Sequence, residues 1–98
     1  MARVRNYEAA FIIAPDVEEE ERKNIIERIK SSITDNDGEI NEVDEWGNKK
    51  LAYEINDYRD GYYTIINFDG KTDIIEVLEH HFNIITNIIR HLIVKKED

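Results

Sequence analysis

The 98-residue sequence has no cysteine, one proline and four glycines. The absence of cysteine argues against a disulfide-stapled scaffold and favours a reducing compartment. No apolar run approaches the roughly 20 residues of a membrane-spanning helix. The first residues contain no apolar segment before charge returns at Asp16, so we expect no signal peptide and a cytoplasmic location.

Positive charge is also scarce, since 13 Lys and Arg residues against 22 Asp and Glu residues give a net charge of −9. Nonspecific nucleic-acid binding depends on cations that neutralise phosphates, so this balance argues against a free, nonspecific nucleic-acid binder. Hydrophobic residues make up 41% of the chain and charged residues 36%, as is typical of globular domains. We expect one domain over residues 1–95 and a short polar tail over residues 96–98.

Hydrophobic periodicity predicts a strand and a helix in the first third of the chain. The strand, over residues 4–14, is nearly apolar on both faces, which is typical of a central strand, and Pro15 ends it. The helix, over residues 16–35, has a capping-box-like start at Asp16 and Glu19. Gly38 is the expected left-handed residue after its end.

In the remainder of the chain, the same periodicity predicts a hairpin, a helix and a strand. A long strand over residues 39–55, with a bulge near Gly47, is followed by a turn over residues 56–61 and a strand over residues 62–68. After a turn at residues 69–70, Thr72 or Asp73 caps a helix, and residues 87–95 form the last strand. This order predicts an α+β, ferredoxin-like βαββαβ fold, with two helices on one face of a four-stranded antiparallel sheet. The other face must meet solvent or a partner.

Few residues suggest catalysis. His80, His81 and His91 are the only histidines, and without cysteine or an HExxH spacing we interpret them as solvated rather than metal-binding. The acidic run Glu18–Glu21 lies at a predicted helix start, where it compensates the helix dipole. The sequence has no nucleophile motif, and its loop APDVEEEE would repel phosphate, so we expect neither an enzyme nor a cofactor.

An RNA-recognition motif has the same topology but needs two aromatic residues two positions apart on its third strand. Here Tyr63 lies on the opposite face from Tyr62, and the position two beyond Tyr62 is Thr64. The base-stacking platform of that motif therefore lacks one ring.

The few basic residues cluster rather than scatter. After the adjacent Lys49 and Lys50, the apolar residues Leu51, Tyr53 and Ile55 alternate onto one side of the predicted strand. If this segment projects from the core, it forms an exposed apolar ridge rimmed by lysine. Such a ridge favours a partner that is part protein and part polyanion. The other clustered cations are Arg3, Arg5, Arg59, Arg90, Lys95 and Lys96.

Four segments resemble, in order, the bacterial family of ribosomal protein six of the small ribosomal subunit. RNYEAAFIIAPD resembles the family's opening strand and its Pro-Asp exit, and WGNKKLAYEI resembles its Gly-x-Lys-Arg/Lys-Leu-Ala-Tyr-x-Ile signature. GYYTIINF resembles the Gly-Tyr-Tyr strand after the turn, and IIRHLIVK the final strand. The resemblance runs nearly end to end and agrees with the ferredoxin-like fold predicted from periodicity.

The resemblance implies a non-enzymatic structural protein of the ribosome. It implies pairing with small-subunit ribosomal protein eighteen and binding, as a pair, to the central domain of small-subunit ribosomal RNA. It also implies phosphate contacts by Lys49 and Lys50 and partner contacts by Leu51, Tyr53 and Ile55. Further RNA-binding candidates are Arg3, Arg5, Arg59 and Arg90.

Some alternatives stay open at this point. Glu54 and Asn56 replace the proline and the basic residue common in the family, and Glu54 adds repulsion beside the two lysines. Arg90 has a second interpretation as an ion-pair partner of Glu8 on the open sheet face. A different function class is a regulatory or oligomerisation module that forms a homodimer through the open face without binding RNA.

Overall fold

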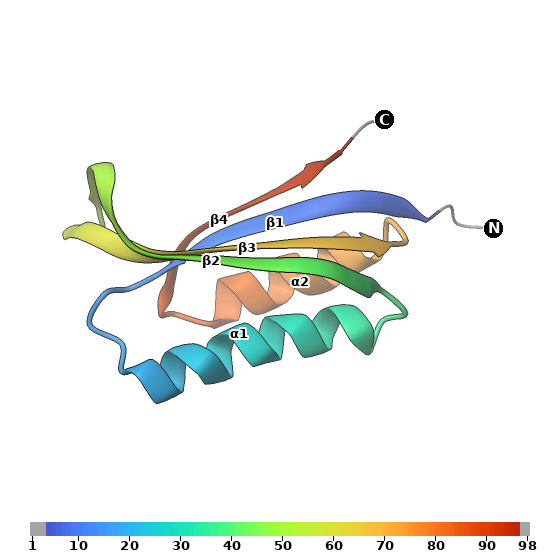
Figure 1. Ribbon diagram of the computed structural model, residues 1–98, viewed down its shortest axis with the longest axis horizontal. Coiled ribbons are helices and arrows are strands. Elements are labelled where there is room, and N and C mark those ends of the chain that lie inside the picture. The colour runs from blue at the N-terminus through green and yellow to red at the C-terminus, as the bar shows by residue number, and fades with distance from the viewer. Residues whose placement is uncertain (1–3, 97–98) are drawn as a thin grey trace.

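The computed structural model describes residues 4–96. Its elements are β1 (Arg5–Ile13), α1 (Glu19–Thr34), β2 (Glu39–Ile55), β3 (Tyr58–Gly70), α2 (Ile74–Ile84) and β4 (Ile88–Lys95). The strands form one antiparallel sheet in the order β2-β3-β1-β4, and both helices cover the same face (Figure 1). The predicted ferredoxin-like βαββαβ fold and the central place of β1 are confirmed. Neither helix within the described residues is long and apolar enough to span a membrane.

The core lies between the sheet and the helices. Alternate residues of β1 point toward the helices because side chains in a strand alternate between faces. In α1 the apolar residues recur at helical spacing and form one buried stripe. The central members of this core are Tyr7, Ala9, Phe11, Ile13, Ile25, Ile26, Ile29, Ile33, Ile66, Phe68, Ile74, Leu78 and Phe82. Over the opposite face of the sheet, residues 4–96 place no helix, and we call it the open face (Figure 1).

The start of α1 differs from prediction, whereas the N-cap of α2 is one of the two residues predicted. The predicted capping box of α1 is wrong, because the N-cap residue is Glu18 and it makes no side-chain cap hydrogen bond. Asp16 lies before the first helical turn, and its carboxylate accepts a hydrogen bond from the Tyr58 hydroxyl at 3.3 Å instead. In α2, Asp73 is the N-cap residue, also without a side-chain cap hydrogen bond.

The end of α1 differs in a similar way, because Asp37, with φ 65°, is the left-handed residue rather than Gly38. The Gly38 N–H donates to the carbonyl of Ile33 at 2.9 Å. A Cβ at position 38 would lie 2.6 Å from Ile33 Cγ2 and 2.8 Å from that carbonyl oxygen. Glycine is therefore required here for space, while aspartate tolerates the left-handed conformation.

The β2–β3 hairpin extends beyond the sheet as an arm, which we define as residues 48–60. Its turn consists of Asn56 and Asp57 alone, with φ values of 49° and 70°, as a tight hairpin of mirror-image type requires. The predicted turn over residues 56–61 is thus too long, and the predicted turn at residues 69–70 is the paired end of β3.

The arm bends because its pairing is irregular. The β2–β3 register shifts between Glu45 and Gly47 and again between Lys50 and Ile55, which confirms the predicted bulge. Gly47 at the base of the arm has φ +86°. The arm rises on the open-face side, away from the helices (Figure 1).

Candidate functional site

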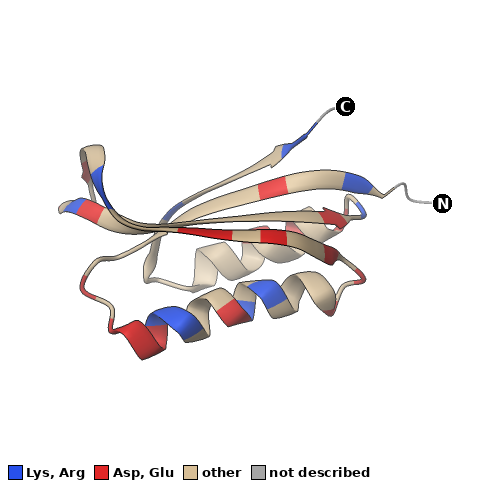
Figure 2. Cartoon of the chain, in the orientation of Figure 1, with Lys and Arg blue, Asp and Glu red and all other residues tan. Residues whose placement is uncertain are grey.

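Four of the six predicted RNA-binding cations lie at the arm end of the sheet. Lys49, Lys50 and Arg59 belong to the arm itself. Arg90, near the start of β4, reaches the arm because its Nη1 donates a hydrogen bond to the Tyr53 hydroxyl at 2.6 Å. Figure 2 shows basic residues at the arm end, beyond the acidic middle of β2. The fold thus collects cations from two distant parts of the sequence.

The other two predicted RNA-binding cations do not join this group. Arg5 pairs with Gly70 at the opposite end of the sheet. Arg3 lies outside the described residues. The predicted tail is also only partly described, since residues 97 and 98 lie outside the described range, while the Lys96 N–H donates to the Asn6 carbonyl at 2.8 Å.

The arm cations differ in how they are paired. The exposed Lys49 and Lys50 side chains make no hydrogen bond or ion pair within residues 4–96. Arg59 Nε, by contrast, lies 3.1 Å from the Glu54 carboxylate. Glu54 is therefore held by Arg59. The two lysines are the arm cations whose donors are free to meet an anion.

Arg90 contacts the open face, but the proposed pairing with Glu8 is wrong. Glu8 lies opposite Val94 in the β1–β4 register, and its carboxylate is 3.9 Å from the Lys96 ammonium. Arg90 instead lies beside Tyr53, with its guanidinium carbon 5.5 Å from the ring centroid. The physical reason is the register of the two strands, which places Arg90 opposite Ile12, four residues along β1 from Glu8.

The predicted apolar ridge of the arm is narrower than expected. Leu51 and Ile55 are half-buried, whereas 61% of Tyr53 is exposed. Leu51 and Tyr53 line a shallow recess of about 170 Å³ together with Lys50 and Arg59. The partner-binding role of Leu51, Tyr53 and Ile55 stays a prediction.

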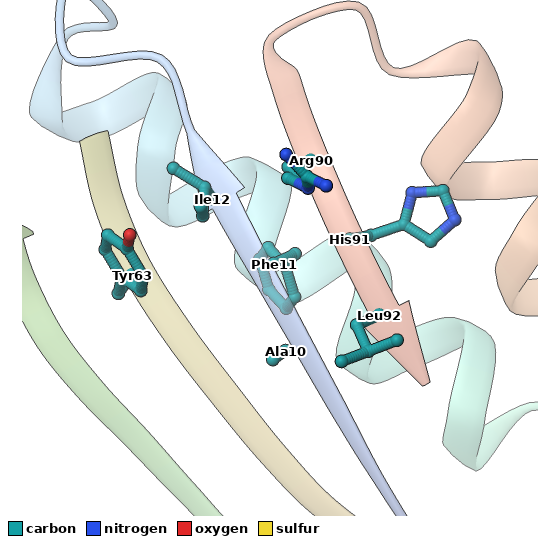
Figure 3. Close-up of a pocket in the computed structure, with 7 residues that line it drawn as sticks. All are labelled: Ala10, Phe11, Ile12, Tyr63, Arg90, His91 and Leu92. Carbon is teal, nitrogen blue, oxygen red and sulfur yellow. The ribbon is translucent and has the colours of Figure 1, made fainter. Parts of the chain in front are cut away.

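A larger apolar surface lies on the open face. A depression of about 300 Å³ is formed there, and Figure 3 views it with the helices behind the sheet. The side chains of Ile12, Tyr63 and Leu92 lie on this face, with Arg90 at its rim, while His91 points toward the helix layer. Leu92 is 61% exposed and Val94 39% exposed. That this face meets solvent or a partner was predicted, but the residues that line it were not, although positions 90, 92 and 94 alternate along the last strand.

Two aromatic rings extend the open face toward β2. Trp46, 51% exposed, stacks on Tyr63 with ring centroids 6.3 Å apart and planes at 14°. Tyr62 projects to the other face, where the Arg22 guanidinium lies 4.0 Å from its ring centroid. The predicted opposition of the two tyrosines is therefore correct. Burial and the hydrogen bond to Glu45 raise the pKa of Tyr62, so its hydroxyl remains protonated.

Acidic residues border these rings. A second depression of about 280 Å³ is lined by Trp46 and Ile65 together with the carboxylates of Glu8, Glu42 and Asp44. The indole N–H of Trp46 donates to the Asp44 carboxylate at 2.8 Å. The open face is thus apolar and acidic over the sheet, whereas the arm carries both signs of charge (Figure 2). Its cations Lys49, Lys50 and Arg59 are accompanied by Glu54, Asp57 and Asp60.

The histidines are less solvated than predicted. His91 lies 2.6 Å from the Glu79 carboxylate and stacks on Phe82, with ring centroids 4.7 Å apart. His81 is half-buried, and its burial lowers the pKa of the imidazole, so only His80 is exposed as expected. Within residues 4–96, no group of three or more His, Cys, Asp or Glu residues is placed to hold a metal ion.

Comparison with known proteins identifies the family. Residues 6–95 match the family described as Ribosomal protein S6. The chain belongs to this family. It is 42% identical over 95 residues to small ribosomal subunit protein bS6 of Caldanaerobacter subterraneus subsp. tengcongensis, a match that covers 97% of this chain and 100% of that protein. The bS6 protein of Moorella thermoacetica is 40% identical, with 97% of each chain covered.

A solved structure shows the same fold. The crystal structure of 30S ribosomal protein S6 from Thermotoga maritima is 39% identical in sequence and superposes with a TM-score of 0.92, covering 96% of this chain and 89% of that one. The family consists of non-enzymatic proteins of the small ribosomal subunit. The resemblance noted in the sequence is therefore confirmed, and the ferredoxin-like fold with it.

Proposed function

We propose that this chain binds the central domain of small-subunit ribosomal RNA as a pair with small-subunit ribosomal protein eighteen. The observation that supports RNA binding most directly is the pair of exposed lysines on the arm of an acidic protein, Lys49 and Lys50. Phosphate contacts need local cations rather than a basic whole, and most hydrogen bonds of such interfaces go to the backbone. Lys49 and Lys50 fit this role because they are exposed and unpaired within residues 4–96.

The need for a protein partner follows from the small number of cations. A chain that neutralises few phosphates binds RNA weakly by itself, especially with a net charge of −9. The open face offers what a protein partner requires, since Leu92 and Trp46 are largely exposed on it. The carboxylates of Glu8, Glu42 and Asp44 beside these residues favour a basic partner. Leu51 and Ile55 lie on the arm and extend this surface toward the RNA, whereas the Tyr53 hydroxyl contacts Arg90.

The test is to measure binding of a transcript of the rRNA central domain, with and without the partner protein, at about 50 mM and 200 mM salt. We expect tight binding only with the partner. The double variant Lys49→Ala/Lys50→Ala should weaken binding, and the slope of log K against log salt should become shallower by about 1.4 to 1.8, the value for two lost phosphate contacts.

A matched control removes two other lysines. Lys23→Ala/Lys30→Ala changes the net charge equally, but these lysines lie on α1, where they pair with Glu19 at 3.5 Å and Glu27 at 3.1 Å. If both double variants lose affinity equally, the effect is one of net charge and the assignment of the arm is wrong. If no RNA binds in either condition and the chain is a stable homodimer, the regulatory or oligomerisation module is the better interpretation.

A further inference from the structure

The contact between Tyr53 and Arg90 joins two parts of the chain that are 37 residues apart. The Arg90 guanidinium donates to the Tyr53 hydroxyl at 2.6 Å, and its carbon lies 5.5 Å from the centroid of the same ring. This contact ties the arm to β4 at the rim of the open-face depression. Among residues 4–96, it is a direct side-chain contact between the arm and β4.

Stability of the fold does not account for this contact. Tyr53 is 61% exposed and is absent from the hydrophobic core, and Arg90 is exposed as well. Polar contacts between exposed side chains contribute little to folding, because water competes for the same groups. The Tyr53 side chain has no other hydrogen bond or ring contact among the described residues. Its geometry toward Arg90 therefore calls for a different explanation.

The contact fixes the direction of the guanidinium. A guanidinium carries five N–H donors in a rigid plane, and Tyr53 occupies one of them. The remaining donors are available for the two oxygens of a phosphate, which an arginine binds best when its plane is already oriented. Arg59 is in a different position, because Glu54 lies 3.1 Å from its Nε and competes for its donors.

We infer that Tyr53 is a positioning residue for RNA binding: it holds Arg90 against the arm so that Arg90, Lys49 and Lys50 meet the same stretch of RNA backbone. This inference rests on the proposed function and adds to it a role for a residue that itself carries no charge. Without the hydroxyl of Tyr53, Arg90 returns to a mobile side chain, and the cation of β4 is separated from those of the arm.

The test is a double-mutant cycle in the complex of this chain with its partner protein and the rRNA transcript. We expect Arg90→Gln to weaken RNA binding about tenfold. The slope of log K against log salt should become shallower by about 0.7 to 0.9, the value for one lost phosphate contact. Tyr53→Phe keeps the ring but removes the hydroxyl, and we expect a loss of about threefold. The double variant should bind like Arg90→Gln alone, because Tyr53 acts only through Arg90.

Two controls separate positioning from structure and from partner binding. Tyr62→Phe removes a hydroxyl that donates to Glu45 at 2.9 Å on the other face, and it should leave RNA affinity unchanged. Tyr53→Phe should leave the melting temperature and the affinity for the partner protein without RNA unchanged. A loss of partner affinity equal to the loss of RNA affinity would place Tyr53 in the protein interface and overturn the inference.

The remaining outcomes separate this inference from the proposed function. If the parent pair binds RNA and Tyr53→Phe binds equally well, the positioning role is wrong and the proposed function stands. Additive losses in the cycle would also overturn it, because they would mean that Tyr53 acts independently of Arg90. If the parent pair does not bind the transcript at all, both the function and the inference fail.

Discussion

The two faces of the sheet differ in what their side chains contact. On the helix-covered face, Phe11 of β1 is 1% exposed and packs against Phe82, with ring centroids 5.4 Å apart. On the open face, Leu92 of the adjacent β4 is 61% exposed. Both faces are rich in apolar side chains, but only one of them is buried by this chain itself. The covered face therefore supports the fold, and the open face with its arm remains available for binding.

The largest effect expected from this difference is on stability. Phe11→Ala removes a buried ring from the covered face, and we expect a loss of about 3–5 kcal/mol in the free energy of unfolding. Leu92→Ala removes an exposed side chain from the open face and should change the same quantity by less than about 0.5 kcal/mol. Urea unfolding of both variants provides the measurement. Similar losses in the two variants would contradict the comparison.

Two glycines, one at the end of α1 and one at the base of the arm, differ in why a side chain is unfavourable there. Gly38→Ala places a Cβ 2.8 Å from the Ile33 carbonyl oxygen, a backbone atom that cannot move aside easily, and should cost about 1–3 kcal/mol. Gly47→Ala meets open space, but φ +86° strains an alanine there by about 1 kcal/mol. Chemical denaturation should show the larger loss for Gly38→Ala. A reversed order would mean that the conformation at the base of the arm matters more than packing at the end of α1.

For binding to the partner protein, we expect substitutions on the open face to matter more than substitutions on the helix side. Leu92→Gln places an amide in the apolar depression of the open face, and we expect the affinity for the partner protein to fall about tenfold. Ile84→Gln is the matched control, because Ile84 is 48% exposed but lies at the end of α2, on the helix side. Calorimetry of the pair without RNA measures both affinities. Equal losses would show that the open face is not the partner surface.

The covered face could be predicted from the sequence, and the open face only in part. The isoleucines at positions 25, 26, 29 and 33 repeat at helical spacing, and the alternation of Tyr7, Ala9, Phe11 and Ile13 gives the inward side of β1, because both patterns are local. The fold class follows from the order of such local patterns. The two lysines of the arm were also visible, since they are adjacent in the chain.

The Tyr53–Arg90 contact could not be predicted, because it depends on how far the arm bends. That bend comes from the register shift between Lys50 and Ile55, and the periodic spacing of apolar residues does not indicate such a shift. The same holds for Trp46, which a bulge turns onto Tyr63. The prediction for the end of α1 was wrong for another reason. The sequence shows that a glycine is present, but whether it is needed for a left-handed backbone or for lack of space depends on what packs around it.

The smallest expected effect is a dependence of stability on pH, and it arises from His81 in the helix layer that covers the sheet. The Nδ1 atom of His81 is buried without a hydrogen-bond partner among the described residues. Burial, followed by the nearby charges of Arg28 and His80, lowers the pKa of His81 below its ordinary value of 6.5. The unfolded chain therefore binds a proton at this site more readily than the folded chain does, and the contribution of His81 to stability falls as the pH drops below about 6.5.

We expect the parent protein to lose more stability than His81→Gln between about pH 7.5 and pH 5.5, because glutamine does not titrate. His80→Gln should keep most of the parent's pH dependence, since His80 is exposed. The pair of His91 and Glu79 is present in all three proteins, so its contribution cancels when they are compared. Urea unfolding at several pH values provides the measurement. A parent and a His81→Gln variant with the same pH dependence would show that the helix layer leaves His81 as well solvated as His80.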